Sequence, residues 1–300
     1  MAKRRKILYE MPLYLMLAPA VVLVLVYSYA PMVGIVMAFQ RVLPGKGLFG
    51  SPWVGWENFK FVFEMPTIFQ VIWNTIRIAG LKAVAGVVVP VTVALMLNNV
   101  SGHLFKRTVQ TVIYLPHFLS WIILAGILVD ILSPSEGFVN QMLGLVGIKP
   151  VFFLGDDQVF PWTMVFTDVW KSFGFGTIVY LAALTDIDPT LYEAAVVDGA
   201  TRGQQTWYIT LPGISGTIIM LSTLSLGNIL NAGFDQIFNL YSPLVYRTGD
   251  IIDTLVYRTG ILNNQYGVAT AVGLLKSVVS LLLIGIGYKL AARWADYRLF

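Results

Sequence analysis

The sequence predicts an all-α membrane protein with about six transmembrane helices, and three observations lead to this fold class. Hydrophobic residues make up 57% of the chain and charged residues only 12%, whereas a soluble domain carries about 25% charged residues. About six segments are long and apolar enough to cross the hydrocarbon core as helices of about 20 residues. The formal net charge of +4 is small, and it comes largely from the two chain ends.

The expected spans follow one another without a linker or an internal repeat. They lie near residues 13–38, 73–97, 109–131, 162–184, 209–230 and 267–290. Pro116 is expected to kink the third span. One transmembrane domain therefore accounts for residues 13–292. We expect the basic N-terminus at 1–12 and the short tail at 293–300 to be cytoplasmic.

Basic residues near the span ends predict this orientation. The run of lysine and arginine at residues 3–6 precedes an apolar span and is typical of a cytoplasmic anchor rather than of a nucleic-acid-binding arm. With the N-terminus inside, several further basic residues fall on the same side, whereas the longer outer loops hold fewer near the span ends. These residues are Lys106, Arg107, Arg202, Lys289, Arg293 and Arg298. The loop at 186–208 is then cytoplasmic.

Several kinds of chemistry are excluded by composition. The chain has no cysteine, so disulfides, thiol catalysis and cysteine-based metal sites are excluded. His103 and His117 are too few for a histidine metal cluster. The phosphate-binding pattern Gly-x-x-x-x-Gly-Lys-Ser/Thr does not occur, so ATP hydrolysis has to take place on another chain. No nucleophile–base pair or metal set is visible, which argues against a membrane enzyme.

The stretch from Asp188 to Pro212, which includes most of the loop at 186–208, is the longest after the N-terminus that lacks the apolar character of its surroundings. Asp188 can cap a helix whose first residue is Pro189, because proline needs no N–H partner there. Gly199 can end that helix in the left-handed conformation. Asp198 lies in the last turn, where a carboxylate opposes the helix dipole. We therefore expect its carboxylate to accept hydrogen bonds from backbone N–H groups or a basic residue such as Arg202.

Three elements of this region resemble the EAA loop of binding-protein-dependent ABC importers. They are Glu193-Ala194-Ala195, Asp198-Gly199-Ala200 and Leu211-Pro212. The resemblance implies the type I importer permease fold, in which this loop is a coupling helix that inserts into a groove on a cytoplasmic ATPase. The alternative is an amphipathic connector on the membrane surface. The implied ATPase-coupling residues are Tyr192, Glu193, Ala194, Ala195, Asp198, Gly199, Ala200, Leu211 and Pro212.

The same resemblance implies the partners and the location of the chain. It implies a second homologous permease subunit, two ABC ATPase subunits and an extracytoplasmic solute-binding protein. ATP and magnesium would be held by the ATPases, and no cofactor by this chain. The location would be a bacterial cell membrane. The aromatic outer segment 40–72 is then either an interfacial belt or a rim that touches the binding protein.

Other stretches resemble the sugar permeases of this superfamily, particularly those that import oligosaccharides. They are Phe105–Gln110, Tyr114–Phe118, Asn231–Phe238 and Tyr266–Gly273. The resemblance implies that the importer carries a carbohydrate. A six-helix secondary transporter for a polar solute is the alternative. Such a transporter would need ion-coupling carboxylates at the midplane or broken-helix repeats, and neither is clear in the sequence.

Polar residues of the last two spans are the candidates for a substrate pathway. On a helical wheel, one side of the expected fifth span carries Thr217, Asn228, Asn231 and Asp235, unless Gly233 breaks that helix. In the sixth span, Tyr266 and Thr270 belong to a narrow stripe of residues along one helix face, which could equally serve tight helix packing. Lys276 beside the stripe favours a water-filled route, because its charge should not face lipid. The candidates are Asn228, Asn231, Asp235, Tyr266, Thr270 and Lys276.

Other charged residues also lie within the expected spans. Asp168 and Lys171 are three residues apart and could pair on one face of the fourth span. A structural ion pair and an opening onto a wet pathway are equally compatible with that spacing. Lys82, in the second span, has no evident partner in the sequence. Together with Lys276, Lys82 could favour an acidic sugar such as a uronate.

Overall fold

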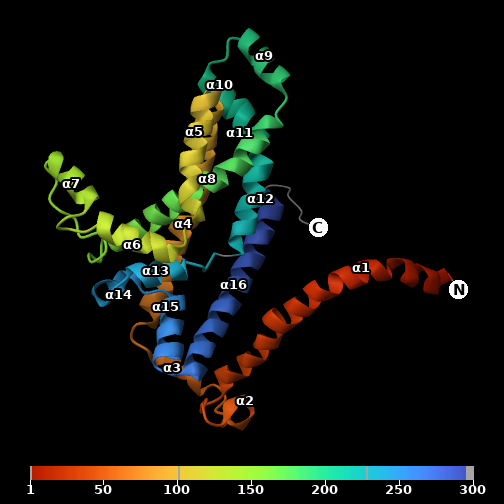
Figure 1. The fold of residues 1–300 in the computed structure, drawn as a ribbon, viewed down its shortest axis with the longest axis vertical. Coiled ribbons are helices and arrows are strands. Elements are labelled where there is room, and N and C mark those ends of the chain that lie inside the picture. The colour runs from red at the N-terminus through yellow and green to blue at the C-terminus, as the bar shows by residue number, and fades with distance from the viewer. Residues whose placement is uncertain (1, 101, 228, 295–300) are drawn as a thin grey trace. The chain divides into compact units, whose positions relative to one another are not determined.

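The computed structural model describes residues 2–100, 102–227 and 229–294, and most of them lie in helices (Figure 1). Within these residues the only strand-like pairing is one isolated antiparallel bridge between Gln40 and Trp53. The all-α fold class is therefore confirmed. Contacts divide the chain into two compact units. The first runs from the N-terminus to Met65 and includes Val256–Leu275, and the second comprises Pro66–Leu255 and the chain from Lys276 onward.

The first unit begins with one long helical segment. It consists of α1 (Ala2–Val24), the π-helical turn η1 (Leu25–Tyr29) and the 3-10 segment η2 (Ala30–Phe39). Residues 11–39 of it are long and apolar enough to cross a membrane. The side chains of residues 11–39 are almost all exposed within the chain, as expected for a helix whose apolar surface is covered by lipid or by other subunits.

The outer segment of the first unit is a folded cap. Two short helices, α2 (Gly47–Gly50) and α3 (Glu57–Glu64), follow η2. Phe39 stacks on Trp53 with ring centroids 5.5 Å apart and also packs against Trp56 and Phe59. Side chains in this segment therefore form a local aromatic cluster, in which Phe59 is buried whereas Trp53 and Trp56 stay 65% and 71% exposed.

The second unit is built around two long helices, α4 (Ile68–Asn98) and α8 (Phe160–Thr185), which pack along each other. Several buried residues from different elements form its main core. They are Ile78, Leu124, Phe160, Met164, Ile237 and Ile251, together with smaller apolar neighbours. At 26 residues, α8 is long enough to cross a bilayer.

The expected third span is broken rather than kinked. It consists of α5 (His103–Tyr114), the 3-10 turn η3 (Leu115–Phe118) and α6 (Trp121–Ile131). The two halves are bent by 106°. The break lies at the predicted Pro116 kink, but it divides the expected span over 109–131 into two helices, because Pro116 removes a backbone donor and Ser120 starts a new helix by capping Ile123 N–H at 3.3 Å. The short outer helix α7 (Phe138–Leu145) follows.

The expected fifth span is also composite. Beyond α9 (Pro189–Val197), it comprises α10 (Arg202–Gln205), the π-helical turn η4 (Thr206–Thr210), α11 (Leu211–Gly213) and α12 (Ser215–Leu226). The parts before and after Ile214 are bent by 55°. After the break come α13 (Phe234–Leu240), η5 (Pro243–Val245), α14 (Tyr246–Gly249), α15 (Ile252–Tyr257), η6 (Arg258–Leu262) and α16 (Tyr266–Trp294).

Among the described residues, three single helices are long and apolar enough to cross a membrane, and the two bent pairs raise this number to five. The single helices are Met11–Phe39, Ile68–Asn98 and Tyr266–Gly287. The remaining expected span coincides with α8, which is long enough but more polar. Each predicted span thus corresponds to a helix or a bent pair, with the two breaks as the main departures.

Candidate functional site

The segment between α8 and α12 forms a capped helix, as predicted. The Asp188 side chain accepts a hydrogen bond from Thr190 N–H at 2.9 Å, and Pro189 is the first helical residue. This N–H donor lowers the pKa of the exposed Asp188 carboxyl below its usual value. Figure 1 shows α9 at one end of the bundle formed by α4, α5 and α8.

The other end of α9 closes with a Schellman motif. Gly199 has a φ of +76°, which confirms the predicted left-handed residue. Ala200 N–H donates to Ala195 O at 2.8 Å, and Gly199 N–H donates to Val196 O at 3.1 Å. These two bonds satisfy carbonyl groups that the helix end would otherwise leave without partners.

The prediction for Asp198 was wrong. Its side chain is exposed, and none of the hydrogen bonds or ion pairs among the described residues involves its carboxylate. Arg202 instead belongs to α10, which Thr201 and Gln204 cap reciprocally. An exposed carboxylate can be solvated by water, so the unfavourable helix dipole does not require a protein partner here.

The surface of α9 is largely open. Leu191, Val196 and Val197 are 51%, 63% and 87% exposed, and Glu193 and Ala194 are also exposed. Exposed large apolar side chains beside small residues are typical of a surface that another protein covers. The described structure therefore supports a docking helix in this position.

One hydrogen bond ties α9 to the beginning of the composite fifth span. The hydroxyls of Tyr192 and Thr210 lie 3.0 Å apart, and Thr210, only 5% exposed, also donates to Gln205 O at 3.3 Å. The next residue, Leu211, packs against a buried cluster that includes Tyr180 and Ile214. A displacement of α9 can thus be passed directly to the span that follows.

The candidates from the fifth span do not share a helix face. Asn228 lies outside the described residues. α12 ends at Leu226, and α13 begins after Gly233, which has a φ of +91°. The helix break for which the prediction allowed at Gly233 is therefore present, and Thr217, Asn231 and Asp235 do not share one helical wheel. The exposed Asn231 accepts a hydrogen bond from Gly233 N–H at 3.2 Å, and the exposed Asp235 lies in the first turn of α13. A glycine in the left-handed region ends the helical periodicity on which the wheel depends.

The Lys82 side chain on α4 contacts the segment around the break between α12 and α13. Its ammonium group donates to Ala232 O at 2.7 Å and to the Gln236 side-chain oxygen. It also lies 3.4 Å from the Asp168 carboxylate. Gln236, fully buried, in turn donates to Thr167 Oγ1 at 2.7 Å. The polar groups of this network are hydrogen-bonded or ion-paired to one another, as is expected of buried polar groups.

The suggested pair between Asp168 and Lys171 is therefore wrong. Asp168 pairs with Lys82 on α4, whereas Lys171 donates to His117 O at 2.9 Å and lies over the Trp121 ring at 5.5 Å. A spacing of three residues permits contact on a helix, but each of these side chains contacts a group on a neighbouring element instead.

Lys276 is also neutralised by a partner. Its ammonium lies 2.6 Å from the carboxylate of Asp253, and the two side chains are only 20% and 25% exposed. The positive charge alone therefore no longer indicates a water-filled route, nor do Lys82 and Lys276 carry free charge for an acidic sugar. The place of Lys276 in a substrate pathway stays a prediction.

The geometry can be compared with known proteins. Residues 86–296 match the family described as "Binding-protein-dependent transport system inner membrane component". The chain belongs to this family. Its membership of the ABC importer permeases, predicted from the EAA-like loop, is confirmed, and so is its place as a membrane component of a transport system.

Two relatives of this permease come from Bacillus subtilis (strain 168). The polygalacturonan/rhamnogalacturonan transport system permease protein YteP is 38% identical over 98% of this chain and 92% of its own length. Protein LplB is 40% identical over 91% of this chain and 86% of its own length.

A solved structure extends the similarity to three dimensions. One chain of a bacterial ABC transporter involved in the import of the acidic polysaccharide alginate superposes with a TM-score of 0.90 at 39% identity. The match covers 98% of this permease and 99% of that chain. The type I importer permease fold is therefore confirmed.

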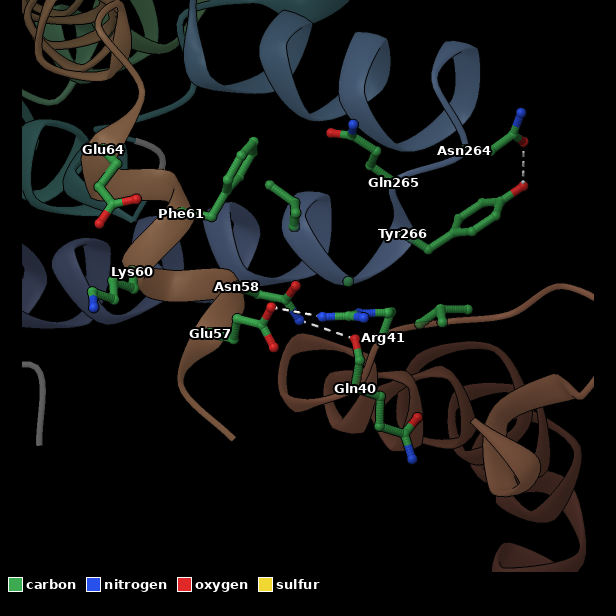
Figure 2. A pocket seen from close by; sticks show the side chains of 13 residues that line it. Gln40, Arg41, Glu57, Asn58, Lys60, Phe61, Glu64, Asn264, Gln265 and Tyr266 are labelled. Atoms are coloured by element: carbon green, nitrogen blue, oxygen red, sulfur yellow. Dashed lines mark hydrogen bonds and ion pairs between the residues drawn. The ribbon is translucent and has the colours of Figure 1, made fainter. Parts of the chain in front are cut away.

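The remaining candidates of the permease belong to the first unit. Thr270 donates to Tyr266 O at 2.7 Å within α16, and Tyr266 OH donates to Asn264 Oδ1 at 3.1 Å. Tyr266 lines a cavity of about 480 Å³ between α3 and the start of α16 (Figure 2). This cavity, the Tyr192–Thr210 bond and the Lys82 network were not predicted. Only the unpaired lysine in an apolar span hinted at the last of them.

Proposed function

We propose that this permease is one of two membrane subunits of an ATP-driven importer that receives an oligosaccharide from an extracytoplasmic binding protein. The observation that carries this proposal is the similarity along 98% of the chain to a subunit of an alginate importer. The names of its relatives support a carbohydrate. They include YteP and the arabinooligosaccharides transport system permease protein AraP of Bacillus subtilis, which is 28% identical over 93% of this chain.

The exposed α9 helix supports a coupling role. In this proposal each of two ATPases accepts the coupling helix of one permease in a groove, and the second permease is a homologous but different chain. Leu191, Val196 and Val197 would supply the apolar contact, and Ala194 would allow close approach. The ATPases would hold ATP and Mg²⁺, because the Walker pattern is absent from this sequence. The orientation that follows places α9 and both chain ends in the cytoplasm.

Transport would follow from moving α9 as a rigid lever. ATP binding would draw the ATPases together, and the Tyr192–Thr210 bond would transmit the movement to η4 and α11. The composite fifth span can then adjust at its bends. Helices of the two permeases would rock between inward and outward openings, limited by the differential affinity of ligands for the two states.

Sugars would be recognised by hydrogen bonds to polar side chains rather than by ion pairs with free cations. Asn231 lies exposed at the break of the fifth span, and carboxamides donate and accept at the same time, as sugar hydroxyls do. Asp235 can accept hydrogen bonds from hydroxyls in the same region. Since Lys82 and Lys276 are already paired, an acidic sugar would require other cations of the complex.

Purification of the full-length tagged chain with its native partners tests this function. We expect an ABC ATPase to co-purify, and we expect ATP hydrolysis in proteoliposomes to rise when a binding protein loaded with oligosaccharide is added. Oligogalacturonides and arabinooligosaccharides are suitable probes. Uptake that proceeds without ATP and follows an ion gradient would instead support a secondary transporter.

A further inference from the structure

The cavity of about 480 Å³ in the first unit has no role in the coupling mechanism. It is formed by the end of η2, by α3 and by the segment before α16 (Figure 2). Its volume lies within the range of about 300–1,000 Å³ that is usual for small-molecule sites. In the orientation proposed above, all the segments that line it belong to outer loops or to the outer end of the last span.

The floor of the cavity is rigidly held. Asn58 Nδ2 donates to Ala38 O at 2.9 Å and to Gln40 O at 3.0 Å. At Gly267 a β-carbon would lie 2.5 Å from Gln40 O and 2.8 Å from Asn58 Nδ2. Only glycine therefore allows α16 to approach this backbone so closely. The walls are positioned before any ligand arrives, which lowers the entropy cost of binding.

One wall is the polar face of α3. Glu57, Lys60, Phe61 and Glu64 line the cavity, and their spacing of three, four and seven residues from Glu57 places them on one helix face. The opposite face of α3 is buried through Phe59 and Val62. Glu57 accepts a hydrogen bond from Arg41 at 2.7 Å, whereas Lys60 and Glu64 have no ion-pair partner among the described residues.

The other wall is formed by Asn264, Gln265 and Tyr266. Figure 2 shows the Tyr266 hydroxyl directed to the Asn264 side chain, where the hydrogen bond measures 3.1 Å. This bond orients the aromatic ring. It engages the amide oxygen of Asn264, so the NH₂ group of that side chain keeps both donors for a ligand.

The lining groups match one chemical class of ligand. Two carboxylates, one guanidinium, one ammonium and several amides surround an aromatic ring, and the formal charges cancel. A cavity without net charge does not select a polyanion or a polycation. Planar carboxylates, amides and guanidinium groups can instead bridge neighbouring hydroxyls, and the aromatic ring offers an apolar face.

We propose that this cavity is an outer saccharide subsite, which holds one end of the transported oligosaccharide. The proposal rests on the proposed function and extends it. A subsite outside the membrane contributes binding only to chains long enough to reach it, so its energetic effect depends on oligosaccharide length. A surface used to dock the binding protein would affect all lengths equally.

Glu64→Ala tests the subsite, because the residue is exposed on α3 and alanine preserves a helix. Glu136→Ala is the matched control, since Glu136 is also an exposed outer-loop carboxylate but does not line the cavity. The measurement is uptake of a disaccharide, a tetrasaccharide and a hexasaccharide of arabinose, which are uncharged, by the complete importer in proteoliposomes. Equilibrium binding of the hexasaccharide to the importer without binding protein is the second measurement.

The compared quantity is the saccharide concentration that gives half-maximal uptake. We expect Glu64→Ala to raise the ratio of this concentration for the hexasaccharide to that for the disaccharide about tenfold, which corresponds to one lost hydrogen bond to a charged group. Glu136→Ala should leave the ratio unchanged. An equal change at every length, or no change together with unaltered hexasaccharide binding, would overturn the subsite. If the unmodified importer takes up no saccharide of any length and hydrolyses no ATP in response, the proposed function itself fails.

Discussion

Gly199→Val should separate ATP hydrolysis from transport, because Gly199 ends α9 in a conformation that valine resists. An L-residue in the left-handed region costs about 1–2 kcal/mol, and a β-branched side chain is poorly suited to it. A β-carbon at Gly199 would meet no atom within 4 Å, so the cost is backbone strain without a clash. An energy of this size lowers the population of the capped helix end by about 5- to 30-fold.

Gly203→Val provides the matched control. Gly203 lies in α10 of the same loop, has open space for a β-carbon and has no positive φ. Valine is more favourable than glycine inside a helix. The two variants therefore make the same chemical change at two sites that differ in backbone conformation.

The assay measures oligosaccharide taken up per ATP hydrolysed by the complete importer in proteoliposomes. We expect this ratio to fall for Gly199→Val while the complex still assembles and hydrolyses ATP, and to stay at the unmodified value for Gly203→Val. Full sugar uptake by Gly199→Val would refute the coupling role of α9.

Three further predictions concern α9 and the buried network around Lys82. Tyr192→Phe removes one hydroxyl pair worth about 1 kcal/mol and should reduce uptake more than ATP hydrolysis; equal losses of both would argue against a link through Thr210. Lys82→Met should lower the unfolding free energy by about 3–5 kcal/mol by leaving Asp168 without its partner, measured as thermal unfolding in detergent, and Lys82→Met combined with Asp168→Leu should recover part of the loss. The lowered pKa of Asp188 means that its cap stabilises α9 above the usual aspartate pKa and fades as pH falls through the lowered value. Hydrogen exchange of α9 should therefore show more pH-dependent opening in the unmodified chain than in Asp188→Asn, and identical profiles would contradict the cap.

The caps of α9 could be predicted because their bonds join near neighbours. Asp188 reaches Thr190, and Ala200 reaches Ala195, so residue types a few positions apart are enough to indicate them. The Asp198 prediction failed for a related reason. Local sequence shows that its carboxylate is unfavourably placed, but it does not show whether water or a protein group will solvate it.

The partners of the charged residues could not be predicted. Lys82 contacts groups around residues 168, 232 and 236, and Lys276 pairs with Asp253. These pairs depend on how the helices pack. In a helical membrane domain, each charge has several candidate partners at similar depth, and the sequence does not rank them.

By itself, the amino-acid sequence determined the membrane class, the approximate spans, the caps of α9 and the family, because each of these follows from apolar run length, from contacts between near neighbours or, for the family, from a short local motif. Only the tertiary structure decided where the third and fifth spans break, which partners neutralise Lys82 and Lys276, and that α3 and the start of α16 enclose a polar cavity. These features arise where segments far apart in the chain meet, and their energies depend on distances and burial that no local pattern encodes.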